Sequence, residues 1–300
     1  MKTYIKYITS CFLLAFLLSC DKEIEEGVMK SDLSKDVEMI TDLGTIILRL
    51  SDDTPIHRNN FIKLVNEKYY DSIAFHRVIK DFVIQAGNPT SKPSKTYNGG
   101  GDTELNYTIE AEIKPNLFHK RGALAAARSG GISNPDLLSS GLQFYIVQRG
   151  TYNDSTLNIQ EKRVNEQIAY KTIINSPKIR SKIDEYTKFS KELRQKEKKN
   201  LTKEDTLKIE ALRDKINLYN IDSLVDIEVQ KMKKYVYPEA HREVYKTIGG
   251  TPHLDQNYTV FGEVIEGMSI VDSIAKVQTN NGGKPINDIR IITARMIKRQ

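Results

Sequence analysis

The sequence predicts a mainly β protein with helices, into which a separate α-helical segment is inserted. Two observations carry this prediction. Short runs with alternating apolar and polar residues flank the middle of the chain, and a period of two is typical of half-buried strands. From residue 151 to residue 247, apolar residues recur instead at helical spacing, and glycine is almost absent.

Residues 1–20 have the features of an export signal. Two lysines precede an apolar stretch, Cys11 to Leu18, that is too short to span a membrane. The end of the segment, Leu17-Leu18-Ser19-Cys20, resembles the bacterial lipoprotein box, and this resemblance implies that Cys20 is diacylated and becomes the first residue of the mature chain. The alternative is an ordinary secretory signal with a chance cysteine.

We therefore expect a protein of the bacterial cell envelope, attached to a membrane through lipid on Cys20 and exposed on the periplasmic or surface side. Residues 21–36 are polar, acidic and without periodicity, which predicts a flexible tether. Cys11 and Cys20 are the two cysteines of the chain. The mature chain would hold no thiol pair, so no disulfide can form within it.

The first part of the β domain is expected over residues 37–150. Its first two apolar-rich runs, Val37–Ile40 and Thr45–Leu50, flank an Asp-Leu-Gly turn sequence and predict a β-hairpin. A helix is then expected to begin at Pro55, because Thr-Pro is a typical helix start and apolar residues follow at helical spacing.

The stretch Phe75–Pro89, FHRVIKDFVIQAGNP, predicts a second hairpin from two alternating runs around a short turn. It would bring the guanidinium of Arg77, the amide of Gln85 and the apolar side chains of Phe82 and Val83 onto one surface. The alternative is a plain buried hairpin with a surface arginine.

This set of side chains suits a reaction without covalent chemistry. Arginine is always charged and only donates hydrogen bonds, so it transfers protons poorly but stabilises negative charge well by electrostatic attraction. Rotation about an X–Pro bond is one such reaction, and its barrier of about 18–20 kcal/mol comes from amide resonance. A donor aimed at the prolyl nitrogen withdraws the lone pair from that resonance, while an apolar pocket holds the ring.

The pattern FHRVIxxFxIQxG resembles the signature of the cyclophilin-type peptidyl-prolyl isomerases. Three further segments are similar to family motifs: Arg121–Arg128 to GxLxMAN, Gly141–Ile146 to GSQFFI, and Thr251–Gly262 to TxWLDGKHVVFG. The resemblance implies a closed antiparallel β-barrel capped by helices, peptidyl-prolyl cis-trans isomerase activity, and no cofactor or metal.

The resemblance also implies which residues form the site. Arg77, Phe82 and Gln85 would be catalytic. The substrate-binding residues would be Val83, Ala126, Ala127, Gln143, Tyr145, His253, Leu254 and Tyr258. Three positions depart from the family: Arg128 replaces the usual Asn, His253 stands where Trp is common, and Tyr258 stands where His is common.

The resemblance lapses after Gly150 and resumes near Thr247, before the second part of the β domain at residues 248–300. The family usually has a short loop here, whereas this chain has a long insertion over residues 151–247. Two stripes predict helices that pack on each other. They are Ile179, Ile183, Tyr186, Phe189 and Leu193, and Ile209, Leu212, Ile216 and Tyr219. Two more helices are expected near residues 222–234 and from Pro238. The insertion would form a helical hairpin or small bundle that need not share the barrel's core.

The insertion contains 21 Lys and Arg against 16 Asp and Glu, and so holds most of the chain's formal net charge of +6. Lysine and glutamate are interspersed without aromatic residues between them, so nucleic acid is not an expected partner. The expected function is isomerisation of X–Pro bonds in unfolded or extended polypeptides, which assists the folding of exported proteins. The alternative is a catalytically weak binding module or chaperone that holds partners through the helical insertion.

Overall fold

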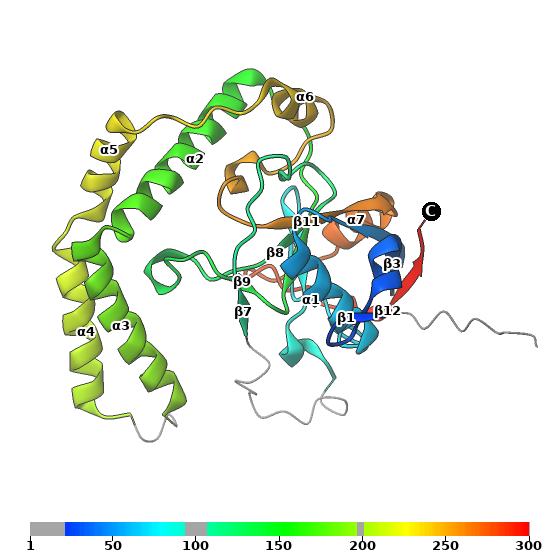
Figure 1. The fold of residues 1–300 in the computed structure, drawn as a ribbon, viewed down its shortest axis with the longest axis horizontal. Helices are drawn as coiled ribbons and strands as arrows, with labels where there is room; N and C mark the ends of the chain where they lie inside the picture. Colours follow the sequence, from blue (N-terminus) through cyan, green and yellow to red (C-terminus); the bar gives the residue numbers. More distant parts are fainter. Residues whose placement is uncertain (1–21, 94–106, 197–200, 300) are drawn as a thin grey trace, which may run out of the picture.

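The computed structural model describes residues 22–93, 107–196 and 201–299. The predicted export signal, including Cys20, lies outside the described residues. Figure 1 shows a β domain that carries a long helical arm on one side. Among the described helices, none combines the length and the apolar character needed to cross a membrane.

The β domain is built on an eight-stranded antiparallel sheet with the order β12-β3-β4-β11-β8-β10-β6-β5. Its strands are β3 (Lys35–Thr41), β4 (Gly44–Leu50), β5 (Arg77–Ile79), β6 (Val83–Ala86), β8 (Ala123–Ala126), β10 (Phe144–Val147), β11 (Val260–Glu266) and β12 (Ile291–Lys298). Both predicted hairpins are present, as β3–β4 and β5–β6. The prediction of a mainly β fold with helices is therefore confirmed.

The two ends of this strand order are joined by a short stretch of backbone contact. The amide of Ser72 donates to the carbonyl of Ile291, and the amide of Ile291 donates to the carbonyl of Ile73, each over 2.8 Å. An antiparallel bridge pairs Ala74 with Arg290. The segment before β5 thus meets the start of β12, so the sheet curves round on itself although β5 and β12 do not form a ladder.

Helices α1 (Pro55–Asn66) and α7 (Met268–Ala275) pack against the sheet and bury its inner face. The core contains Phe61 of α1 and Phe144 of β10, whose rings meet edge to face at 5.5 Å. The smaller elements are β1 (Glu23–Glu25), β2 (Val28–Met29), η1 (Lys30–Ser34), η2 (Pro89–Ser91), β7 (Thr108–Ile109), η3 (Gly131–Ser133), β9 (Ser139–Ser140) and η5 (Pro252–Leu254).

The structure differs from the flexible tether predicted over residues 21–36. Val28 is 1% exposed and lies in the core cluster. Glu25 accepts a hydrogen bond from the side chain of Asn59 of α1, over 2.8 Å. One buried apolar residue and polar contacts to a helix are enough to order this segment, although its composition alone is typical of disordered chain.

The insertion contains five helices in its described part: α2 (Asp154–Ile174), α3 (Pro177–Gln195), α4 (Lys203–Asn217), α5 (Ile221–Lys231) and α6 (Glu239–Thr247). Helices α3 and α4 form the hairpin that the stripes predict, with Ile179, Ile183 and Ile216 buried together. The first helix, α2, was not predicted. Its buried residues include Leu157, which packs near the barrel, and Ile174, which packs on the hairpin, so they form no single stripe.

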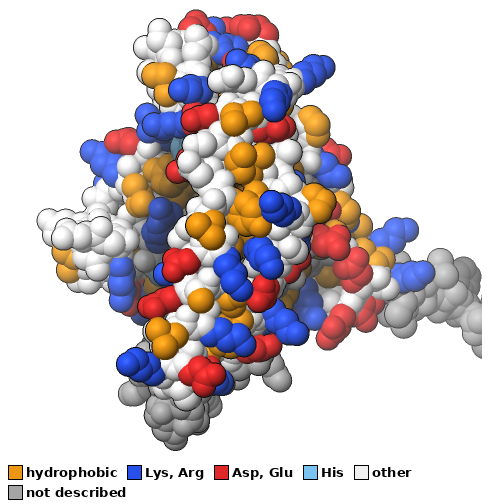
Figure 2. Space-filling view, turned by 90° about the vertical axis from the view of Figure 1, so that its left-hand side faces the viewer, with side chains coloured by type: hydrophobic (Ala, Val, Ile, Leu, Met, Phe, Trp, Pro, Cys, Tyr) orange, Lys and Arg blue, Asp and Glu red, His pale blue; other side chains and the backbone are white. Residues whose placement is uncertain are grey.

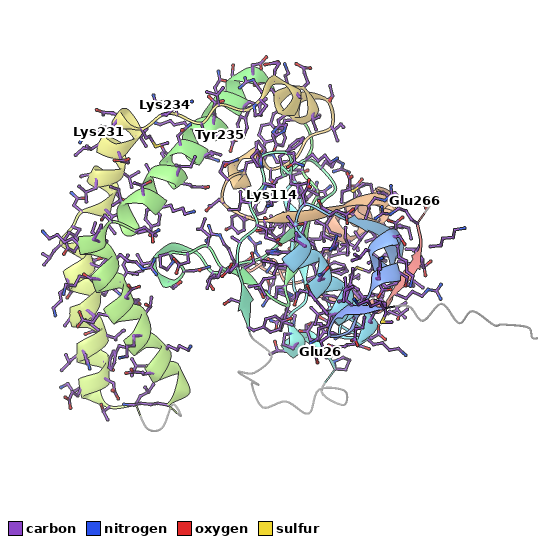
Figure 3. The ribbon with its side chains drawn as sticks, in the orientation of Figure 1. Glu26, Lys114, Lys231, Lys234, Tyr235 and Glu266 are labelled. Carbon is purple, nitrogen blue, oxygen red and sulfur yellow. The ribbon has the colours of Figure 1, made fainter. Side chains whose placement is uncertain are left out.

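The arm has a free outer face and an anchored base. Figure 2 shows the outer face, where positive and negative side chains are mixed and apolar groups lie between them. Figure 3 labels Tyr235 on the segment that returns from α5 to α6 across α2. Asn165 of α2 holds this segment, since its side chain donates to the Tyr235 carbonyl and accepts from the Tyr235 amide, over 2.9 and 2.7 Å.

The base of the insertion packs against the β domain through a buried cluster that is separate from the barrel's core. Tyr152, Tyr237 and Tyr245 form a buried cluster, and Phe118 of the β domain packs against it. Tyr245 is fully buried, and its ring meets Phe118 edge to face at 5.4 Å. Apolar residues concentrate where the insertion begins and ends, so this part of the arm belongs to the packed β domain. We call the cluster of Tyr152, Tyr237 and Tyr245 the arm base.

Candidate active site

Strand register aligns the polar side chains of the site. Arg77 on β5 and Tyr145 on β10 are both paired with Gln85 on the strand between them, β6. Arg77 Nη1 donates to Gln85 Oε1 over 3.3 Å, and Gln85 Nε2 donates to Gln143 Oε1 over 3.1 Å. The amide chain therefore holds the guanidinium in one orientation at the edge of the sheet.

These strands form one wall of a pocket of about 300 Å³. It is lined by Arg77, Phe82, Val83, Gln85, Ala127, Arg128, Tyr145, Leu254 and Tyr258. The structure thus brings together all but three of the residues that the sequence assigned to the site, and adds Arg128. The pocket has an apolar floor with a fixed guanidinium at its rim, and we call it the proline pocket after the ligand that the family resemblance implies.

Two of the remaining predicted residues support the proline pocket without lining it. Gln143 lies behind Gln85 as its hydrogen-bond acceptor. His253 stacks on Phe82, with ring centroids 5.6 Å apart and an interplanar angle of 15°. Burial lowers the pKa of His253 to about 4, and the positive charges of Arg163 and Arg149 act in the same direction. The ring is therefore neutral at pH 7 and serves as an apolar plate behind Phe82.

The side chain of Ala126 does not line the proline pocket, so its predicted contact with substrate stays a prediction. Its side chain lies in the barrel core, whereas Ala125 and Ala127 face the pocket side of β8. Successive residues of a strand point to opposite faces, so the side chains of Ala126 and Ala127 lie on opposite sides of the sheet.

Arg128 closes one side of the proline pocket. Its guanidinium lies over the ring of Tyr258, 4.4 Å from the centroid, in a cation–π contact. Its Nε donates to the carbonyl of Asn257 over 2.8 Å, and its Nη2 donates to Asn257 Oδ1 over 2.5 Å. Burial lowers the pKa of Arg128, and the neighbouring tyrosines Tyr258 and Tyr145 oppose that shift. The residue that departs from the family motif is thus a built part of the wall.

A buried chain of hydrogen bonds links the floor of the proline pocket to the arm base. The hydroxyl of Tyr145 lies 3.0 Å from His119 Nε2, and His119 Nδ1 lies 2.8 Å from Asp255 Oδ1. The hydroxyl of Tyr245 donates to Asp255 Oδ2 over 2.7 Å. Because a carboxylate only accepts hydrogen bonds, His119 Nδ1 donates to Asp255. Burial raises the pKa of Tyr145 and Tyr245 well above the usual value, so both remain protonated donors.

The arm base also fixes the loop that carries three predicted site residues. Tyr237 donates from its hydroxyl to the carbonyl of Pro252 over 2.7 Å. Pro252 begins η5, which contains His253 and Leu254, and Tyr258 follows shortly after this element. Sequence reasoning missed these supports, since His119 and Asp255 lie 136 positions apart and Tyr245 belongs to the insertion. No local motif marks such partners.

The proline pocket offers a fixed hydrogen-bond donor beside an apolar seat, and none of its lining residues is a cysteine, serine, histidine or carboxylate. Within the described residues, no group of three or more His, Cys, Asp or Glu side chains could hold a metal ion. The lining suits a reaction in which a bond rotates without forming a covalent intermediate.

Comparison with known proteins gives the same assignment. The model of the family described as cyclophilin type peptidyl-prolyl cis-trans isomerase/CLD matches residues 36–164 and 239–296, which is more than half of the chain. The chain therefore belongs to the cyclophilin-type peptidyl-prolyl cis-trans isomerases, and it is an isomerase of that family. The match runs into α2 and resumes at α6, so it includes Tyr152 and Tyr245 of the arm base and omits Tyr237 together with α3, α4 and α5.

Two relatives illustrate the similarity. A protein of Staphylococcus haemolyticus, provisionally named a peptidyl-prolyl cis-trans isomerase, is 27% identical over 272 residues, covering 90% of this chain and 92% of that protein. A protein of Staphylococcus aureus strain COL with the same name is 27% identical, covering 90% and 93%. A solved cyclophilin-type isomerase of Cryptosporidium parvum aligns over 89% of this chain and 99% of its own, with 19% identity and a TM-score of 0.47.

Proposed function

We propose that this isomerase acts on X–Pro bonds in unfolded or extended segments of exported proteins and thereby assists their folding in the bacterial cell envelope. The observation that supports it is the proline pocket, in which Arg77 is fixed at the rim of an apolar seat formed by Phe82, Leu254 and Tyr145. The export signal and the lipoprotein box at Cys20 support a membrane-attached location.

In the proposed mechanism the prolyl ring occupies the apolar seat and the preceding residue lies outside it. The guanidinium of Arg77 donates to the prolyl nitrogen as the C–N bond twists and the nitrogen lone pair leaves amide resonance. Gln85 keeps the guanidinium in place through its Oε1. The interaction strengthens as the bond rotates, so it favours the twisted state over both planar isomers.

Replacement of Arg77 by alanine tests this mechanism. Loss of one fixed charged donor is expected to lower kcat/KM about a hundredfold. The measurement is a protease-coupled isomerisation assay on an X–Pro tetrapeptide, with thermal unfolding to show that the fold is kept. Arg295→Ala is the matched control, because Arg295 is an exposed residue of β12 that pairs with Glu38. An Arg77→Ala protein that is folded and fully active would remove Arg77 from the mechanism.

Replacement of Cys20 by serine tests the proposed location. A lipoprotein would lose its fatty acid label and accumulate as a soluble or uncleaved form. Metabolic labelling with a fatty acid measures this directly, and equal label in the variant and the wild type would contradict lipid attachment at Cys20.

A binding module with little turnover is the second candidate. The observation that favours it is the arm itself, whose base is hydrogen-bonded to the loop that carries Leu254 and Tyr258 of the proline pocket. This candidate would be supported if the wild-type protein binds proline-containing peptides but does not raise the isomerisation rate of the tetrapeptide above the uncatalysed rate.

A further inference from the structure

A second hollow, of about 310 Å³, lies between the β domain and the arm. It is lined by Arg128, Gly130, Gly131, Asn134, Leu137, Gln167, Tyr170, Lys171, Ile174, Asn257 and Tyr258. Arg128 and Tyr258 also line the proline pocket. The stacked Arg128–Tyr258 pair is therefore the shared wall of two adjacent hollows, and we call the second one the arm hollow.

Contacts on both sides hold the arm hollow open. On one side, Asn257 Nδ2 donates to Gln167 Oε1 of α2 over 2.8 Å, which ties the loop of Tyr258 to the arm. On the other side, Asn175 Nδ2 donates to the carbonyl of Pro135 over 3.1 Å, next to η3. Figure 1 shows the loop that carries η3 extending from the β domain towards the arm. Both walls are thus fixed elements.

The lining combines positive charge with apolar surface. Lys171 is exposed on α2, and Arg128 carries the second charge. No aspartate or glutamate is among the lining residues. The nearby carboxylate of Asp136 is engaged by Arg180, whose two terminal nitrogens donate to its two oxygens, each over 2.9 Å.

A neighbouring hollow on the arm, between α2 and α5, has the opposite character. Its lining includes Glu166, Asp222 and Asp226 as well as Arg163. The positive lining of the arm hollow is thus a local property of the surface towards the proline pocket, and does not follow from the overall basic charge of the insertion.

We propose that the arm hollow is a subsite for the client residues that flank the isomerised X–Pro bond, and that it favours an acidic side chain there. The inference rests on the proposed function, since the same client chain must occupy the proline pocket. The shared wall makes this possible, because an extended chain advances by about 3.3–3.6 Å per residue and needs few residues to pass from one hollow to the next. The carboxylate would lie beside Lys171 and Arg128, and its neighbours would contact Tyr170 and Leu137.

The test uses three peptides that each contain one X–Pro bond. The first is a tetrapeptide that fills the proline pocket alone. The other two are longer and differ in one residue, which is glutamate or glutamine, placed in turn at successive positions on either side of the bond. At one position and low salt, wild-type kcat/KM is expected to be about threefold higher for the glutamate peptide, as for an exposed ion pair.

Two variants with the same change in charge distinguish an effect of the arm hollow from an effect of the protein's net charge. Lys171→Glu is expected to abolish or reverse the preference for glutamate while the rate on the tetrapeptide is unchanged. Lys188→Glu is the matched control, because Lys188 is exposed on α3 and is absent from the lining of the arm hollow. If Lys171→Glu proves unstable by circular dichroism, Lys171→Gln replaces it and is expected to remove the preference without reversing it.

The outcomes distinguish this inference from the proposed function. No turnover of the tetrapeptide by wild type would contradict the proposed function. Turnover of the tetrapeptide with equal rates on the glutamate and glutamine peptides at every position would overturn the subsite alone. Equal loss of preference in the Lys171 and Lys188 variants would also overturn it, since the preference would then reflect net charge.

Discussion

The arm base and the distal hairpin α3–α4 belong to one insertion, but they are stabilised in different ways. Tyr245 and Tyr237 of the arm base are buried to 0% and 2% exposure and donate to Asp255 and Pro252 of the β domain. The hairpin instead buries residues such as Ile183 and Ile216 against its own partner helices. The arm base therefore shares the stability of the barrel, whereas the hairpin depends on its own apolar seam.

Because of this difference, we expect the arm base to affect catalysis and the hairpin to have little effect on it. The supports of the proline pocket come from the arm base through the Tyr245–Asp255–His119–Tyr145 chain. The hairpin reaches past that site and has few buried apolar contacts with the β domain. We expect it to open locally at a lower free energy than the barrel, because cooperative units follow buried contacts.

The largest contrast is expected from truncating one buried ring in each region. Tyr245→Ala should lower the free energy of unfolding by about 4 kcal/mol, as for other buried aromatic side chains, and leave Asp255 without its donor. Phe189→Ala in α3 should open the hairpin and leave the barrel transition and tetrapeptide turnover unchanged. Urea unfolding, hydrogen exchange and the tetrapeptide assay together measure this. Equal loss of activity in both variants would show that the two regions form one cooperative unit.

The second-largest contrast between the barrel and the hairpin is expected when the pH is lowered. The folded protein keeps His253 neutral down to about pH 4, whereas the unfolded chain protonates it near pH 6.5. Between these values the unfolded state binds more protons, so stability falls as pH falls. His253→Phe keeps the ring on Phe82 but cannot titrate. From pH 7 to pH 5 it should lose about 1–2 kcal/mol less stability than wild type, after allowance for partial exposure of the ring.

The hairpin offers the control for this pH effect, because residues 177–217 contain no histidine. Urea unfolding of wild type and His253→Phe at both pH values gives the barrel difference, and hydrogen exchange reports the hairpin. Burial also lowers the pKa of His57 and His241, but these groups are common to both proteins and cancel in the comparison. Identical pH dependence of the two proteins would show that His253 titrates normally.

The smallest effect is expected from removing the hairpin. Replacement of residues 176–219 by a short Gly/Ser loop would join α2 to α5, whose ends share the cluster of Ile174 and Ile221. Turnover of the tetrapeptide should stay within about twofold of wild type, as for surface changes away from a site. Replacement of residues 153–246, by contrast, would remove Tyr237 and Tyr245 of the arm base and expose Phe118, so that protein should unfold or lose activity. Loss of tetrapeptide turnover in the protein without the hairpin would contradict the proposed division between the arm base and the hairpin.

The sequence alone predicted the site well because the family motifs are local. Arg77, Phe82 and Gln85 fall within one hairpin, so alternation and turn position already place them on one surface. The same rule places the side chains of Ala126 and Ala127 on opposite faces of the strand. The stripes of α3 and α4 were also visible, because those helices bury one face each against the other.

What the sequence could not give depends on contacts between distant residues. Helix α2 buries Leu157 at the arm base and Ile174 on the hairpin, and a helix with two partners shows no single apolar face. The His119–Asp255 pair and the role of Tyr245 follow only from the fold. The acidic segment at residues 22–36 is ordered by hydrogen bonds to α1, such as Glu25 with Asn59, which composition does not encode.

The second attachment of the arm to the β domain, near η3, has a mechanical consequence. The arm is attached at its base and again where Arg180 grips Asp136 and Asn175 meets Pro135. An arm attached at one point could rotate about that point, but an arm attached at two separated points can only bend between them. The spacing of the walls beside the proline pocket is then set in advance, so a client loses its own freedom on entry while the protein loses little. Recognition there should select segments that already fit the gap, without a closing movement of the arm.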